Sequence, residues 1–171
     1  MEIYKLKKSR LLLIILALIF TFGVMTAWAQ EKVKVKFKAF AVVTKIEKLK
    51  VDDTEGHVIS LYESTGVTSD GKFVRYFKSR NDLIKGNGTI SGYGKYVNVK
   101  DGDYYWAKYQ GTANTTKSPE GKLKFTLEGN YSYINGTGKY KGIQGGGTFK
   151  GGAIGKGIAD IDVEGEYVIK K

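Results

Sequence analysis

The stretch from Asn135 to Gly151 reads NGTGKYKGIQGGGTFKG, and it decides the fold class. Glycine occurs at about every third position, and aromatic and lysine residues stand between the glycines. A helix does not tolerate this density, because each interior glycine costs about 1 kcal/mol relative to alanine. Glycine instead relieves crowding at bulges and sharp bends of β-sheets and barrels. The stretch therefore predicts strongly bent β-structure, and it names no chemistry.

The remainder of the chain after residue 30 has the same character. Short alternating runs are separated by turn signals such as Asp70-Gly71 and Asp101-Gly102, and helical periodicity is almost absent. This pattern is typical of an antiparallel sandwich or barrel, so we expect an all-β domain. The predicted strands are eight in number and lie near 33–44, 57–66, 72–79, 88–99, 103–113, 122–133, 145–151 and 158–169.

The first and last predicted strands carry opposite charges on their polar faces. Lysine occupies alternate positions in 34–38, and acidic residues occupy alternate positions in 160–166. We predict that these strands are antiparallel neighbours, which closes an eight-stranded barrel with a ladder of opposite charges outside. The alternative is an open sandwich whose two charged faces are solvated independently. The apolar positions change parity after Lys38, which predicts a bulge near Ala39.

The hairpin around Asp101-Gly102 allows a register to be predicted. If these two residues alone form the turn, Val97 lies opposite Trp106 and Gly94 lies opposite Tyr109. The pairing places a tyrosine ring over a cross-strand glycine, which protects a weak position in a sheet.

The N-terminus has the three regions of a secretory signal peptide. Basic residues at 5–10 precede an apolar run that begins at Leu11, and Ala27-Trp28-Ala29 supplies small residues at a cleavage site. We expect a signal-peptide helix at 1–29 that is cleaved after Ala29, and a single barrel domain at 30–171. The location would then be periplasmic or extracellular. An uncleaved membrane anchor is the alternative, because residues 11–29 nearly suffice to span a bilayer.

Composition limits the covalent and charged partners. Cysteine is absent, so neither a disulfide nor a lipidated cysteine is available. The formal net charge is +11 for the whole chain. A basic exported protein can meet anionic polymers of the cell envelope, although solvated lysines are the simpler explanation of the charge. We expect no nucleic-acid partner, because no helix-turn-helix, zinc-ligand or RNA-binding signature is present.

Several glycine-rich stretches carry a family resemblance. Residues 136–143 read GTGKYKGI and residues 145–151 read GGGTFKG, while Asp101-Gly102-Asp103 precedes an aromatic strand and Gly165-Glu166-Tyr167 closes the last one. In these stretches the chain resembles the bacterial allene oxide cyclase-like barrels, to which the plant dirigent proteins are related by architecture. The resemblance covers roughly 86–171, and residues 30–80 agree only in their strand pattern.

The resemblance implies an eight-stranded barrel with a lumen that can hold a small apolar molecule. The activity of the plant cyclases is not implied, because their catalytic residues have no matching positions in this chain. Cysteine is absent, and Pro119 stands in a polar loop. The acids and the arginine of dirigent proteins have no matching motif either.

Five side chains are candidates for ligand binding. Glu63 and Arg75 are charges in otherwise apolar strand faces, where a charge is costly unless it is paired or solvated. With Asp70-Gly71 as the turn, Glu63 lies opposite Lys78 and Arg75 takes the other face. Either charge could orient a ligand inside the lumen, or both could be structural, Glu63 in a rim ion pair and Arg75 over exposed aromatic rings. The candidates for the cavity wall are Tyr105, Trp106 and Tyr109.

No catalytic or metal-binding set is evident. His57 is the only histidine, which leaves no nucleophile–histidine–acid arrangement to argue for. Asp52, Asp53, Glu55 and His57 lack a known ligand spacing, and they fit turn chemistry better than a metal site. Neither a phosphate-binding loop nor a dinucleotide fingerprint is present. We expect no metal and no cofactor.

The sequence leaves three functions open. The first is non-catalytic binding of a small apolar or aromatic molecule in the lumen. The second is a cyclase or isomerase that confines a hydrophobic substrate in a dry cavity. The third is a basic surface protein that binds anionic envelope polymers, which a cluster of unpaired lysines would favour. The oligomeric state does not follow from the sequence.

Overall fold

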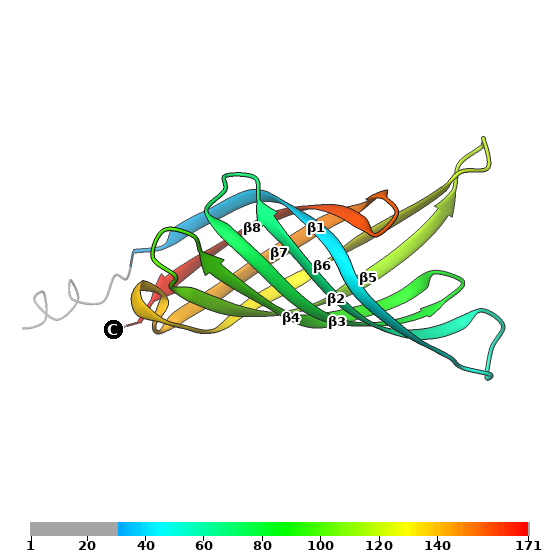
Figure 1. Cartoon of the computed structure of the whole chain (residues 1–171), viewed down its shortest axis with the longest axis horizontal. Coiled ribbons are helices and arrows are strands. Elements are labelled where there is room, and N and C mark those ends of the chain that lie inside the picture. The colour runs from blue at the N-terminus through cyan, green and yellow to red at the C-terminus, as the bar shows by residue number, and fades with distance from the viewer. Residues whose placement is uncertain (1–30, 171) are drawn as a thin grey trace, which may run out of the picture. The chain divides into compact units, whose positions relative to one another are not determined.

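The computed structural model describes residues 31–170. The predicted fold class is confirmed, because eight antiparallel strands form a closed barrel in which each strand pairs with the next and β1 pairs with β8 (Figure 1). The predicted signal-peptide helix and the cleavage site after Ala29 lie outside the described residues. No helix within residues 31–170 is long and apolar enough to cross a membrane. The elements are β1 (Val33–Lys50), β2 (His57–Thr68), β3 (Phe73–Ile84), β4 (Asn87–Asn98), β5 (Tyr104–Lys117), β6 (Leu123–Gly136), the 3-10 helix η2 (Gly138–Tyr140), β7 (Ile143–Gly155) and β8 (Ile158–Ile169).

The predicted ladder between the first and last strands is confirmed. Lys36 lies opposite Glu164, and its Nζ is 2.7 Å from a Glu164 carboxylate oxygen. Lys38 Nζ lies 3.1 Å from Asp160, so the row of pairs continues along the strand. Exposed ion pairs contribute little stability individually, but the pairing of β1 with β8 covers the sheet edges of these two strands from Val33 to Val42.

The bulge in β1 lies farther along the strand than the sequence predicted. Pairing between β1 and β8 is regular through Ala39, which is fully buried, so the prediction of a bulge there was wrong. Phe40 and Val42 are apolar residues on the outer face, 40% and 46% exposed, and this produced the apparent change of parity. The register shift falls between Val43 and Lys45, in the pairing of β1 with β2.

The register of the β4–β5 hairpin also differs from the prediction by two residues. Lys95, rather than Val97, lies opposite Trp106, and Gly92, rather than Gly94, lies opposite Tyr109. The turn is longer than two residues, because Gly102 N donates to the Asn98 carbonyl at 2.9 Å. The expected tyrosine–glycine contact still forms, with Gly92 in the place predicted for Gly94. A Cβ on Gly92 would lie 2.7 Å from the Tyr109 hydroxyl oxygen.

Alternation along the strands places small residues beside large rings inside the barrel. Phe149 in β7 faces Gly129 in β6, and Phe77 in β3 faces Gly94 in β4. A Cβ on Gly129 would lie 2.8 Å from the Phe149 ring and 2.2 Å from the Gln110 carbonyl oxygen. The glycines therefore provide the space that these rings occupy.

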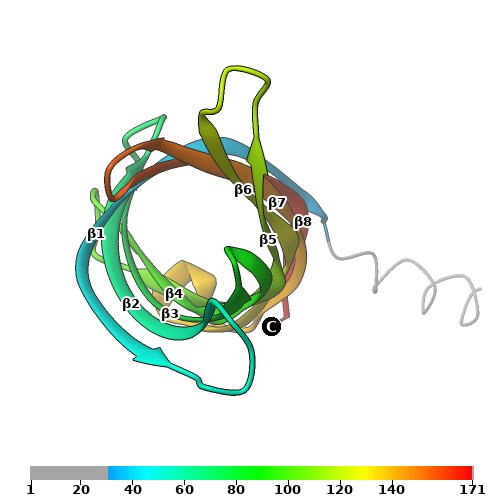
Figure 2. The same cartoon turned by 90° about the vertical axis from the view of Figure 1, so that its right-hand side faces the viewer.

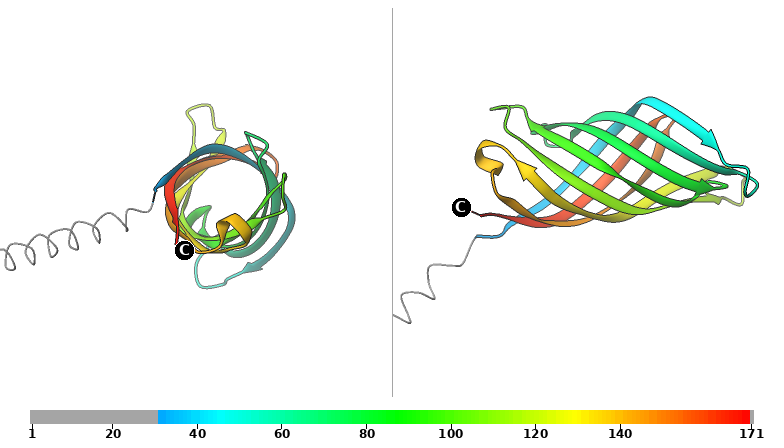
Figure 3. Two further views of the ribbon diagram at one scale, coloured as in Figure 1. Left: turned by 90° about the vertical axis from the view of Figure 1, so that its left-hand side faces the viewer. Right: turned by 90° about the horizontal axis from the view of Figure 1, so that it is seen from below.

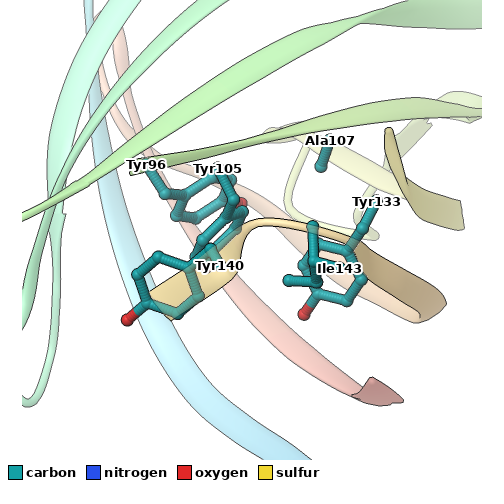
Figure 4. Packing of buried hydrophobic residues seen from close by; sticks show 6 residues of the cluster. All are labelled: Tyr96, Tyr105, Ala107, Tyr133, Tyr140 and Ile143. Atoms are coloured by element: carbon teal, nitrogen blue, oxygen red, sulfur yellow. The ribbon is translucent and has the colours of Figure 1, made fainter. Parts of the chain in front are cut away.

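One end of the barrel is filled by aromatic side chains, and we call this group the aromatic plug. At its centre Tyr105, 5% exposed, stacks on Tyr96 with ring centroids 4.8 Å apart (Figure 4). Tyr133 and Tyr140 each meet Tyr105 edge to face at 5.2 Å, and Tyr140 comes from η2. Figure 3 (left) shows η2 at the rim of this end of the barrel. The opposite end carries the connections β1–β2, β3–β4, β5–β6 and β7–β8. We call it the open end.

Candidate functional site: a lumen with a buried arginine

Between the aromatic plug and the open end the lumen contains a cavity of about 230 Å³. All eight strands contribute to its lining. Gly155, Gly157 and Ile158 border it and are also exposed, so the cavity reaches solvent beside the β7–β8 turn. Figure 2 shows the barrel from this end. The larger apolar side chains of the wall are Val43, Phe77, Ile90, Phe125, Leu127, Phe149, Ile161 and Val163.

Arg75 supplies the positive charge of this lumen. It faces inward from β3 between Phe73 and Phe77, and only 2% of it is exposed. The guanidinium carbon lies 4.5 Å from the centroid of the Phe77 ring and 5.2 Å from that of Tyr96. Nε and Nη1 have no hydrogen-bond partner among the described residues. Two aromatic faces therefore hold the guanidinium, while its donors stay free for an acceptor.

No acidic side chain compensates this charge inside the barrel. Within residues 31–170, no aspartate or glutamate lines the cavity, and no ion pair includes Arg75. The acidic residues of β2 and β3, Glu63 and Asp82, face outward. Glu63 pairs with Lys78 at 3.5 Å and Asp82 pairs with Arg80 at 2.7 Å, both on the outer face. The lumen is therefore apolar in its walls and positive at one point.

The cavity also contains neutral hydrogen-bonding groups. The hydroxyls of Ser79 and Tyr109 are hydrogen-bonded to each other, and Ser64 and Asn81 line the cavity nearby on β2 and β3. Burial raises the pKa of Tyr109, although the hydrogen bond with Ser79 and the charge of Arg75 act in the opposite direction. Burial likewise raises the pKa of Tyr105. Both phenols therefore remain neutral at physiological pH and can donate a hydrogen bond.

The structure divides the five predicted ligand-binding residues between the two faces of the barrel. Arg75 and Tyr109 line the cavity, and Tyr105 lies inside the barrel as the centre of the aromatic plug. Glu63 and Trp106 lie on the outer face, where Glu63 forms the expected pair with Lys78. The rings that Arg75 covers, Phe77 and Tyr96, are inside the barrel rather than exposed. The lumen therefore contains three of the five.

Other polar residues of the site were not singled out from the sequence. Ser79 and Asn81 follow Arg75 and Phe77 at alternate positions of β3, so they point into the same cavity. Ser64 and Tyr62 alternate in the same way on β2. The spacing of two from Arg75 was the available signal for Ser79 and Asn81, and the predicted third strand, which ended at residue 79, excluded Asn81.

The residues near His57 form a hydrogen-bonded network outside the lumen. His57 Nδ1 lies 2.6 Å from an Asp53 carboxylate oxygen, and Nε2 lies 2.8 Å from one of Asp82. Hydrogen bonds to Asp82 and then Asp53 raise the pKa of His57. Among residues 31–170, no group of three or more histidine, cysteine, aspartate or glutamate side chains has a metal-binding arrangement. The network joins the β1–β2 connection to β3.

Comparison with known proteins gives only a weak structural similarity. No protein-family model matches the chain, and no curated protein matches it. Among solved structures, the chain is similar to a pterocarpan synthase dirigent protein, with 12% sequence identity over 82% of this chain and 90% of that chain and a TM-score of 0.47. A similarity at this level does not assign a family. Membership of the allene oxide cyclase-like group therefore stays a prediction, and the functional argument depends on the lumen itself.

Proposed function

We propose that this barrel binds a small apolar or aromatic molecule in its lumen. The observation that carries the proposal is the cavity of about 230 Å³, which has mainly apolar walls and opens beside the β7–β8 turn. Small-molecule sites typically combine such walls with a few placed polar groups. Arg75, Ser79 and Tyr109 are among the polar groups here.

The cavity limits the size of the molecule. An apolar cavity of about 150 Å³ is large enough for benzene. The cavity of about 230 Å³ therefore suits one aromatic ring with a short side arm, or an aliphatic body of similar volume. Because the cavity reaches solvent at Ile158, a longer substituent can extend through the open end.

We propose further that binding takes place outside the cytoplasm. The support is the basic, apolar and small-residue order of residues 5–29, which is the pattern of a cleaved signal peptide. The intact mass of the protein purified from its own host tests this. A chain that begins at Gln30 agrees with export and cleavage, and a chain that retains residues 1–29 contradicts cleavage.

A second candidate, a cyclase or isomerase, is favoured by one observation. Arg75 is buried in the lumen and lacks a carboxylate partner among the described residues. A preorganised guanidinium in a water-poor site can stabilise negative charge that develops on a substrate oxygen. The ladder of β1 and β8, by contrast, pairs Lys36 and Lys38 with acids, and this does not favour a surface for anionic polymers.

Calorimetric titration with 3-phenylpropan-1-ol tests the binding function. We expect wild type to bind this neutral aromatic probe and Ala159→Phe to bind it at least tenfold more weakly, because Ala159 lines the cavity and a ring there would fill it. Thr148→Phe, on the exposed outer face of β7, is the matched control and should bind like wild type. Equal affinity of all three proteins would overturn the proposal, and so would a wild type that binds neither this alcohol nor the acid of the same carbon skeleton.

Native mass spectrometry of protein from its own host adds a test of the two candidates. A retained small molecule that is released without chemical change agrees with the binding function. A retained molecule that the protein converts to an isomer, with conversion lost in Arg75→Met, agrees with the enzyme.

A further inference from the structure

The chemistry of the occupant is restricted by the single charge in the lumen. We infer that the cavity selects an amphipathic acid, a molecule with an apolar or aromatic body and one carboxylate that Arg75 binds. This inference rests on the proposed binding function and adds the class of ligand. The geometry of Arg75 carries it.

The first step is that the guanidinium has unused donors in a buried place. Arg75 is 2% exposed, and its Nε and Nη1 lack hydrogen-bond partners among the described residues. Buried polar groups in folded proteins are almost always hydrogen-bonded, so such a pair of orphan donors needs a partner. The guanidinium fork matches a carboxylate, to which it can donate two parallel hydrogen bonds.

The second step is that the charge of the lumen is single. Arg75 is the only lysine or arginine among the residues of 31–170 that line the cavity, and no acid there neutralises it. One guanidinium balances one negative charge. A phosphate ester with two charges would bury the second one without a partner, which is costly. The site therefore fits a monocarboxylate better than a phosphate.

The third step concerns orientation. Arg75 lies opposite Tyr96 of the aromatic plug on one side and opposite Gly66 on the other. Glycine contributes no side chain there, and Tyr96 contributes a ring face at 5.2 Å. The larger apolar wall residues, such as Phe125 and Leu127, lie nearer the open end. The carboxylate therefore enters first, and the body remains toward the open end.

The neutral hydroxyls fit the same occupant. Tyr109 and Ser79 line the cavity with Arg75, and their mutual hydrogen bond leaves one hydroxyl proton free for an external acceptor. A carboxylate has lone pairs beyond those that the guanidinium uses. A neutral alcohol of the same skeleton can use the hydroxyls but cannot pair with the charge.

The experiment compares two probes with the same carbon skeleton, 3-phenylpropanoate and 3-phenylpropan-1-ol, by calorimetric titration of the full chain at pH 7. We expect wild type to bind the carboxylate at least tenfold more tightly than the alcohol. In Arg75→Met the two affinities should become equal within twofold, while the alcohol still binds. Arg80→Met removes an arginine of the same strand from the outer face, and it should keep the wild-type ratio.

The outcomes separate this inference from the function on which it rests. Binding of neither probe to wild type refutes the binding function and the inference with it. Equal affinities in wild type, or a preference that survives in Arg75→Met, refute the inference alone. Should Arg75→Met not fold, wild type with the methyl ester of the same acid decides, because the ester keeps both oxygens, loses the charge and adds only one methyl group. An ester that binds as tightly as the acid overturns the inference.

Discussion

Replacing Arg75 by methionine should stabilise the empty barrel, although it removes the charge on which we base ligand recognition. Arg75 is 2% exposed and has two unpartnered nitrogen donors. Replacing a buried ion pair by apolar residues of similar volume is often neutral or stabilising by about 1–4 kcal/mol, and a buried charge without a partner is the less favourable starting state. The contacts with the Phe77 and Tyr96 rings offset part of this gain, since a cation–π contact is worth about 0.5–2 kcal/mol. We expect a net gain of about 1–2 kcal/mol.

Equilibrium urea unfolding of wild type and Arg75→Met measures this difference, with unchanged dependence on denaturant as the sign that the fold is retained. Arg80→Met is the control, because Arg80 is half exposed and forms one outer ion pair with Asp82 at 2.7 Å. Its unfolding free energy should fall by at most about 1 kcal/mol. A loss of more than about 1 kcal/mol in Arg75→Met would refute the reasoning, because it would show that the guanidinium stabilises the unliganded barrel.

Three further predictions concern the barrel itself. Gly129→Ala should lower the unfolding free energy by about 3 kcal/mol, because its Cβ would lie 2.2 Å from a backbone oxygen; urea unfolding at the wild-type level would contradict this. Tyr105→Ala should cost about 3–5 kcal/mol through the loss of buried ring contacts, measured in the same way, and a loss below 1 kcal/mol would argue against the aromatic plug. The carboxylates of Asp82 and Asp53 raise the pKa of His57 in the folded state. The unfolding free energy of wild type should therefore exceed that of His57→Gln by its full amount below about pH 6.5, the ordinary pKa of histidine, and this difference should decline as the pH rises through the raised pKa. A difference in unfolding free energy that is constant from pH 5.5 to 9 would exclude this linkage.

Closure of the barrel could be predicted because its evidence is a strictly local pattern. Lysine and acid alternate along two strands, and matching them requires only that the strands are neighbours, as the Lys36–Glu164 pair shows. The orientation of Arg75 relative to Glu63 followed in the same way from the turn at Asp70-Gly71. Alternation within a strand is thus a reliable guide to which residues share a face.

The errors arose where a turn or a bulge shifts the alternation. Asn98 accepts hydrogen bonds from Gly102 N and, with its side chain, from Lys100 N, and this lengthens the β4–β5 turn. The predicted pairing of Trp106 was displaced by two residues for that reason. An even shift keeps every side chain on its face, so it did not change which residues of β5 share a face. Trp106 was nevertheless taken as a candidate for the cavity wall and lies on the outer face, and the bulge was misplaced because exposed Phe40 was read as interior.

The hollow itself could not be predicted from any one strand. Whether eight inward rows leave a cavity depends on how their volumes sum at each level of the barrel. Glu63 and Trp106 were candidates by residue type, and their outer location depends on which face of each strand is turned inward. That choice requires the pairing of all eight strands.

The contrast between the two ends of the barrel bears on function. Large rings fill the end beside η2, which shows that this chain can pack its own lumen. Toward the open end the same strands place several small side chains inward among the larger apolar ones, and the unpaired guanidinium of Arg75 lies between the two regions. A barrel selected for stability alone would fill the cavity and replace Arg75, because an unfilled cavity and a buried unpaired charge both lower the free energy of unfolding. Departures from internal consistency that coincide in space are expected at functional sites. The inward small residues that keep this region hollow are Ala41, Ser64, Ser79, Ala153 and Ala159.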